Sequence, residues 1–242
     1  MSKRGKGERF RAATAFALTF CVLALNFSPL SLLPFSTDAY AASVLPSQSE
    51  VERLINLLES RYGRMRGLAA EFEQVYRAPG TRERRERGRL FLERPRRMRW
   101  EYDPKPGKLF IVNNRRVWFY VAADREAVEA DAGSVSDERF PFLFLLGQTN
   151  LRRPFSSITL VNQEGWFTQT RELRLLPRSR AGGLREIFLE IFPDGRISKV
   201  RLVDDAGASS EVTLTNVREN FVAPAEAFEF RPPPGVTVRR QK

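Results

Sequence analysis

The chain has 242 residues, with 40 Lys and Arg against 29 Asp and Glu, a formal net charge of +11, and 42% apolar residues, enough for a sizeable core. It contains no histidine, and its single cysteine, Cys21, lies in an apolar N-terminal stretch. Imidazole bases, disulfides, thiolate metal sites and cysteine nucleophiles are therefore excluded beyond that stretch, and we expect neither an enzyme nor a bound cofactor.

Residues 1–41 have the pattern of a secretory signal. A basic region runs to Arg11, an apolar stretch covers residues 12–35, and the small residues of Ala39-Tyr40-Ala41 fit a signal-peptidase site. Cleavage there would leave residues 42–242, which we expect to form a single domain.

Two other fates of the leader stay open. The apolar stretch is long enough to cross a bilayer, so it could be kept as an anchor. A lipoprotein signal at Cys21 is disfavoured because Phe20, and not a small residue, precedes it. In each case the basic residues stay inside, and the folded part is expected in the periplasm.

The first predicted element of the domain is a helix over residues 47–65. Its apolar residues recur at helical spacing and form one stripe. They are Val51, Leu54, Ile55, Leu58, Tyr62 and Met65.

From Leu68 onward the period of the apolar residues changes to two, which predicts strands. The clearest half-buried strand has Met98, Trp100 and Tyr102 alternating with charged residues. The predicted strands of this half cover residues 68–76, 88–94, 98–102, 109–112, 116–121 and 128–132.

The segment 140–147 breaks the strand pattern. It is the most apolar part of the domain, with Pro141 suited to the first turn of a helix and Gly147 to its C-terminal cap. A short helix that is apolar all round must meet apolar surfaces on every side, so we expect a core element, a lid or an interface.

Strands are predicted again in the second half, including a hairpin across Pro193-Asp194-Gly195. They cover residues 155–161, 166–169, 172–176, 185–192, 196–203, 210–217 and 228–230. About eleven strands with short turns favour an antiparallel meander, mainly β with a few helices. Because strands twist, a sheet of that size curls around an inner face that the helices could cover.

Five runs resemble the LolA family of outer-membrane lipoprotein carriers. Gly88–Pro95 is similar to a G-x-L-x-x-x-R-P run of that family, and Met98–Tyr102 to the aromatic strand after it. Val117–Tyr120 is similar to the next signature of the family, Pro141–Leu146 to its apolar lid, and Phe228–Val236 to its C-terminal ending. The order and spacing of these runs agree over nearly the whole domain.

The resemblance implies an unclosed barrel of about eleven strands under a helical lid, whose inner surface binds the acyl chains of lipoproteins. It implies cargo taken from an ABC-type release complex in the inner membrane and passed to an acceptor at the outer membrane. Arg94 matches the arginine that latches the family's lid through backbone hydrogen bonds; a solvated strand-end arginine is the alternative. We expect a monomer.

The predicted lipid-binding residues combine the helix, the strands and the apolar segment. They are Leu54, Leu58, Met98, Trp100, Tyr102, Ile111, Trp118, Phe142, Leu145 and Leu146. Each of them could instead be ordinary core.

Other functions stay open at this point. A protein of this fold could bind another lipid or a glycolipid, or act as a lipoprotein-sensing regulator. Carboxylate-pair catalysis would need Glu71 with Glu73, or Asp204 with Asp205, and all four fit solvated positions better. The basic run Arg82–Arg99 suggests nucleic acid, but export argues against it, and we expect no nucleic-acid partner.

Overall fold

The computed structural model describes residues 46–105, 107–132, 150–161, 169–179 and 183–241. The chain divides into two compact units, Met1–Ala42 and Ser43–Lys242. The predicted leader and the predicted lid segment 140–147 lie outside the described residues, and everything below concerns the second unit.

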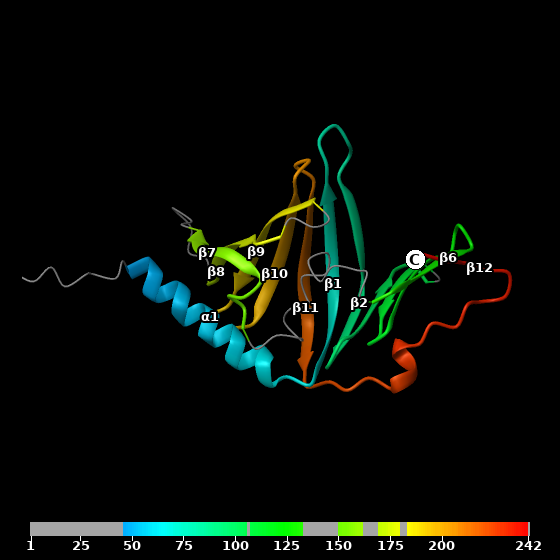
Figure 1. The fold of residues 1–242 in the computed structure, drawn as a ribbon, viewed down its shortest axis with the longest axis horizontal. Coiled ribbons are helices and arrows are strands. Elements are labelled where there is room, and N and C mark those ends of the chain that lie inside the picture. The colour runs from blue at the N-terminus through cyan, green and yellow to red at the C-terminus, as the bar shows by residue number, and fades with distance from the viewer. Residues whose placement is uncertain (1–45, 106, 133–149, 162–168, 180–182, 242) are drawn as a thin grey trace, which may run out of the picture. The chain divides into compact units, whose positions relative to one another are not determined.

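The described secondary structure begins with a helix and continues with strands (Figure 1). The elements are α1 (Pro46–Arg64), β1 (Gly67–Arg77), β2 (Arg84–Glu93), β3 (Arg97–Tyr102), β4 (Lys108–Val112), β5 (Arg116–Val121), β6 (Glu126–Asp131), β7 (Phe155–Val161), β8 (Arg171–Pro177), β9 (Leu184–Ile191), β10 (Ile197–Asp204), β11 (Ser209–Glu219), the 3-10 helix η3 (Ala225–Phe228) and β12 (Thr237–Arg240). No helix within these described ranges is long and apolar enough to cross a membrane.

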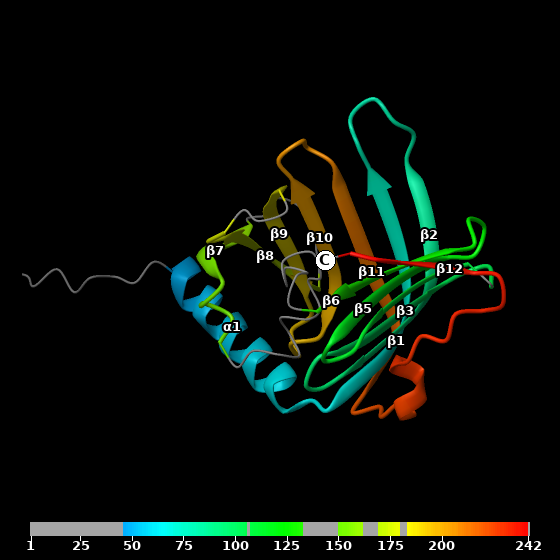
Figure 2. The ribbon, with the colours of Figure 1, turned by 45° about the vertical axis from the view of Figure 1, so that its right-hand side comes forward.

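Twelve strands form one sheet in the order β12-β6-β5-β4-β3-β2-β1-β11-β10-β9-β8-β7. Two meanders, β1 to β6 and β7 to β11, meet where β1 pairs with β11 (Figure 2). All pairs are antiparallel except β12 with β6. The sheet has two edge strands, β12 and β7, so the predicted unclosed, mainly antiparallel β fold is confirmed.

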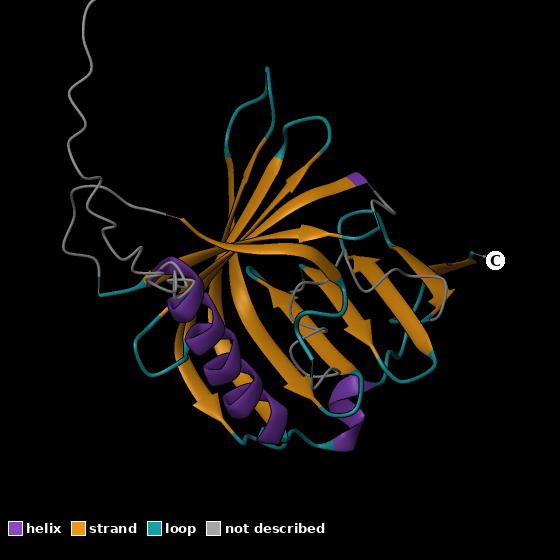
Figure 3. Ribbon diagram, turned by 60° about the vertical axis from the view of Figure 1, so that its left-hand side comes forward, coloured by secondary structure: helices purple, strands orange, loops and turns teal. Residues whose placement is uncertain are grey.

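Helix α1 lies across one face of the sheet (Figure 3) because its apolar stripe needs a partner surface. Leu54 and Leu58 are fully buried and belong to the same core as Met98 and Trp100 of β3. We call the face that shares this core with α1 the inner face, and the opposite one the outer face.

The predicted hairpin across Pro193-Asp194-Gly195 is confirmed as the turn between β9 and β10. Gly195 has a φ of +84°, a conformation that side chains rarely adopt. A Cβ at this position would also lie 2.7 Å from Cγ of Leu57, so α1 packs directly against the turn.

The C-terminal region differs from the prediction in two ways. Phe228 belongs to η3 and not to a strand, and its ring is buried, with the Arg97 guanidinium of β3 5.9 Å from its centroid. A further strand, β12, lies beyond residues 228–230, which were the last strand predicted from the sequence. A three-residue alternation is too short to distinguish a strand from a tight turn anchored by one buried aromatic ring.

Candidate functional site

The inner face of β1 to β6 carries two uninterrupted rows of apolar side chains. Residues directly opposite each other in neighbouring antiparallel strands share a face, so the register defines these rows. One row is Leu68, Leu92, Met98, Val112, Val117 and Ala130; the other is Ala70, Leu90, Trp100, Phe110, Phe119 and Val128.

Exposure rises along the second row from Leu90 to Phe119 and is lower again at Val128, which is half-buried. Leu90 is fully buried and Trp100 is 7% exposed, whereas Phe119 is 41% exposed. An exposed phenylalanine in a row of apolar side chains marks a surface that can accept another apolar group.

An aromatic cluster continues the inner face on the other side of Trp100. The ring of Phe72 meets Trp100 edge-on with centroids 4.6 Å apart, and Tyr102 at 5.1 Å. The Tyr102 hydroxyl donates to Oε1 of Gln74 (2.9 Å), and Gln74 Nε2 donates to Oγ of Ser210 (2.8 Å). Burial raises the pKa of Tyr102. The apolar surface therefore ends in a polar rim. This rim also holds the ion pair of Lys108 with Glu86, and the Lys108 Nζ lies 4.5 Å from the Tyr102 ring centroid.

Arg94, the predicted latch, contacts the end of α1. Its Nη2 donates to the backbone carbonyl of Tyr62 (2.9 Å), in the last helical turn, where carbonyls lack intrahelical partners. Its Nε is buried and has no hydrogen-bond partner among the residues that the structure describes. The described contact of Arg94 is thus with α1, while the segment that it was expected to hold lies outside the described residues.

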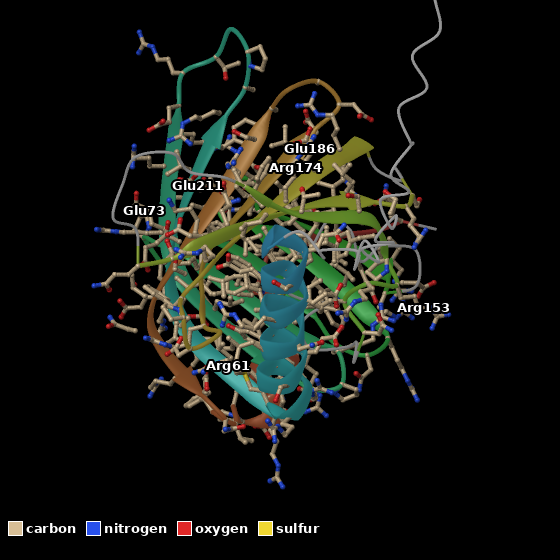
Figure 4. The ribbon with its side chains drawn as sticks, turned by 90° about the vertical axis from the view of Figure 1, so that its left-hand side faces the viewer. Arg61, Glu73, Arg153, Arg174, Glu186 and Glu211 are labelled. Atoms are coloured by element: carbon tan, nitrogen blue, oxygen red, sulfur yellow. The ribbon has the colours of Figure 1, made fainter. Side chains whose placement is uncertain are left out.

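Tyr62 fixes the same helix end to the other half of the sheet. Its phenol oxygen accepts the backbone N–H of Ile197 (2.9 Å). Burial raises the pKa of Tyr62 to about 12, and the hydrogen bond from Ile197 offsets only part of that rise. Arg61, labelled in Figure 4, adds bonds from Nε to Glu219 and from Nη1 to the carbonyl of Asp194, both 2.7 Å.

The structure brings together five of the ten predicted lipid-binding residues. Leu54, Leu58, Met98 and Trp100 are buried in one core, and Tyr102 packs against it half-buried. Three others, Phe142, Leu145 and Leu146, lie outside the described residues.

The prediction that Ile111 and Trp118 share the inner face is wrong. Trp100 pairs with Phe110, so Ile111 falls on the opposite face and pairs there with Trp118. A shift of one residue in register moves a whole strand's side chains to the other face. Phe110 and Phe119 occupy the inner positions instead, and the sequence prediction missed them.

The carboxylates that could have formed an acid–base pair have other partners. Glu71 accepts a hydrogen bond from Asn216 (2.7 Å), and Glu73 forms an ion pair with Arg85 (2.8 Å), both on the outer face. Asp204 caps the turn before β11 by accepting the backbone N–H of Ala208 (2.8 Å). Among the described residues no group of three or more potential acidic or sulfur metal ligands is found.

The sequence profile of the family described as "Outer membrane lipoprotein carrier protein LolA" matches residues 64–231. The chain belongs to the LolA family. An outer-membrane lipoprotein carrier protein of Methylococcus capsulatus (strain Bath) is 30% identical over 220 residues, covering 89% of this chain and 99% of that protein. A protein of the same name from Legionella pneumophila (strain Corby) is 28% identical over 211 residues, covering 87% and 96%.

Among solved structures, a LolA superfamily protein from Nitrosomonas europaea aligns with a TM-score of 0.41 and 11% identity, covering 74% of this chain and 97% of its own. An uncharacterised conserved protein from Thermus thermophilus aligns with a TM-score of 0.49 and 13% identity, covering 79% and 99%.

Proposed function

We propose that this LolA-family chain carries lipoproteins through the periplasm, with their acyl chains lying against the inner face of β1 to β6. The observation that carries the proposal is the pair of apolar rows that crosses six strands without a polar side chain and includes the exposed Phe119. Its relatives of similar length are named as outer-membrane lipoprotein carriers.

The energetics of the cargo explain why a carrier needs such a face. A triacylated anchor has about 40 methylenes, each of which costs about 0.8 kcal/mol in water, or about 30 kcal/mol in total. Transfer through an aqueous compartment therefore requires an apolar surface that travels with the anchor. No reaction is needed for this task, and we propose that the chain catalyses none.

We further propose that Arg94 controls access to the inner face. The guanidinium holds the C-terminal end of α1 through the hydrogen bond to the carbonyl of Tyr62, and its buried Nε has no partner in the described part of the chain. A buried donor without a partner is unfavourable, so an acceptor that satisfies Nε can compete with the contact to α1 and release it. The proposed partners are an ABC-type release complex in the inner membrane and an acceptor at the outer membrane.

The test is purification of the periplasmic protein followed by mass spectrometry of what copurifies. Lipoproteins are expected to copurify with the wild type. With Phe119→Glu their amount should fall about tenfold or more, because burying a carboxylate against an acyl chain costs free energy. Phe119 is exposed enough for the variant to fold, whereas Trp100→Glu would bury a charge.

Val238→Glu is the matched control. Val238 is 39% exposed, close to the 41% of Phe119, but it pairs with Ala127, whose other partner Tyr120 is on the outer face. This variant should keep the wild-type amount of lipoprotein. Copurification of free lipid or glycolipid without lipoprotein would replace the proposal with a carrier of another lipid.

A further inference from the structure

The outer face carries a groove that the proposed cargo does not use. Its floor is formed by Phe91 of β2, Leu109 of β4 and Tyr120 of β5, and its wall by residues 221–233 after β11. The volume of this groove is about 570 Å³. A second hollow of about 350 Å³ shares Leu109 and Tyr120 with it and extends the groove to Lys105 and Lys108.

The wall of the groove is held in place by specific contacts. The ring of Phe221 lies 6.0 Å from that of Phe91, and the ring of Phe230 lies 5.5 Å from that of Tyr120. Arg99 of β3 donates from Nη1 to the carbonyl of Ala227 (2.8 Å). The groove is therefore a preformed and mainly apolar hollow with aromatic side chains on both sides. Charged side chains complete its lining: Arg99, Glu101, Glu226, Glu229 and Arg231.

One end of the groove carries an excess of positive charge. The single carboxylate of Glu101 accepts hydrogen bonds from Arg89 (2.8 Å), Arg99 (2.7 Å) and Lys105. Burial opposes ionisation of Glu101, but the bonds from Lys105 and Arg99 outweigh it and lower its pKa to about 2. Lys105 lines the second hollow, and its side chain is 47% exposed. Arg89 lies outside both hollows, but it binds the same carboxylate and its side chain is 51% exposed, so both cations can meet a further anion.

The chemistry of the walls favours an acyl chain over a peptide. The backbone groups of β3 and β4 are paired with strands on both sides, and Pro224 and Pro233 of the wall have no N–H. An extended peptide laid in the groove would leave its own N–H and C=O groups without partners, at a cost in free energy. A hydrocarbon chain has no such groups.

We propose that this groove is a second lipid site, which binds a single-chain amphiphile with an anionic head. The acyl chain lies along Phe91, Leu109 and Tyr120, and the carboxylate or phosphate head lies at Lys105 and Arg89. The site is on the opposite face of the sheet from the proposed cargo surface and does not depend on it.

Two variants with single reporters test the proposal. Trp118 lies two positions before Tyr120 on the outer side of β5, about 7 Å away along the strand, whereas Trp100 lies on the inner face. Each tryptophan can be kept alone by changing the other and Trp166 to Phe. Brominated stearate should quench Trp118 fluorescence saturably. Quenching confined to Trp100 would overturn the proposal and leave the proposed lipoprotein function intact.

Groove variants in the chain that keeps only Trp118 sharpen the result. Leu109→Glu should weaken the quenching at least about tenfold, because it places a charge against the acyl chain. Thr159→Glu is the matched control, because it places the same charge on an exposed outer position of β7, and β8 to β11 and β1 lie between it and the groove strand β2. This variant should bind brominated stearate as the unsubstituted Trp118-only chain does. If Leu109→Glu fails to fold, quenching in the unsubstituted Trp118-only chain still shows whether stearate binds in the groove.

Head-group probes separate the possible occupants. Brominated stearate and a brominated lysophosphatidate should both bind, and the neutral brominated stearyl alcohol about tenfold more weakly; equal binding of the alcohol would refute the anionic site. Lys105→Glu should weaken the binding of the two anions several-fold.

A competition experiment distinguishes a lipid from a peptide as the occupant. A peptide of alternating Leu and Glu should not displace stearate. If the peptide displaces stearate at a concentration lower than the one at which stearate binds, the groove is a protein-docking surface and the proposal is overturned.

Discussion

Replacement of Tyr62 by Phe removes the bond that ties the end of α1 to β10. The phenol oxygen accepts the N–H of Ile197, which is 2% exposed, so Tyr62→Phe leaves a buried donor without a partner. Such a loss costs about 1–3 kcal/mol of unfolding free energy. Urea denaturation at neutral pH should show this loss, and Tyr76→Phe, at a half-buried tyrosine, should show little change.

The same residue gives a pH dependence with a defined sign. The pKa of Tyr62 is about 12 in the folded protein and about 10 in an unfolded chain. Its protonated form therefore stabilises the fold fully below about pH 10, and this contribution of about 3 kcal/mol is lost as the pH rises toward 12. The difference in stability between wild type and Tyr62→Phe should shrink over that range. A difference that stays constant with pH, or one below about 0.5 kcal/mol at neutral pH, would refute the reasoning.

Three further predictions address the latch, a turn and a carboxylate. Arg94→Leu should fold and load lipoprotein but fail to hand it to an acceptor in a reconstituted transfer assay; normal handover would remove Arg94 from the mechanism. Gly195→Ala should lower the unfolding free energy at least about 1 kcal/mol more than Gly80→Ala, since both have positive φ but only Gly195 would collide with Leu57; equal losses in urea denaturation would contradict this. Glu101→Gln should cost roughly 2 kcal/mol at neutral pH and progressively less as the pH falls from about 4.5 toward 2, because the pKa of Glu101 is lowered to about 2; acid denaturation curves that stay parallel would count against it.

The fold class and half of the site followed from local patterns in the sequence. The 3.6-residue stripe of α1 and the alternation of Met98, Trp100 and Tyr102 correctly placed these residues in one core. Both patterns depend only on neighbouring positions in one element, and burial imposes them directly.

The faces of Ile111 and Trp118 could not be predicted in the same way. The hairpin between β4 and β5 pairs Ile111 with Trp118, so these two share a face. Which face they share depends on the number of residues in the turn from Tyr102 to Lys108, which sets the register of β4 against β3. The conformation of a turn of that length is not fixed by its residue types, and one residue more or less reverses the assignment.

The latch illustrates a different limit. The family resemblance pointed to Arg94 but not to the carbonyl of Tyr62 that it contacts. That contact joins residues that lie 32 positions apart, between a helix end and a strand end, and no periodic pattern reports it. The sequence did not predict the outer groove for a similar reason, because its wall comes from a proline-containing stretch whose regular structure is the short 3-10 helix η3.

The seam between β1 and β11 has a consequence for how the polypeptide acquires its shape. Gln74 and Ser210, which bond across this seam, are 136 positions apart in the sequence. During synthesis, β1 to β6 can pair first. The backbone amides and carbonyls on the free edge of β1 remain unpaired until β11 in the C-terminal half has been made. Such non-local pairing slows folding and leaves a strand edge open to other chains in the meantime. We therefore expect slow refolding and a tendency to aggregate when the protein is truncated before β11.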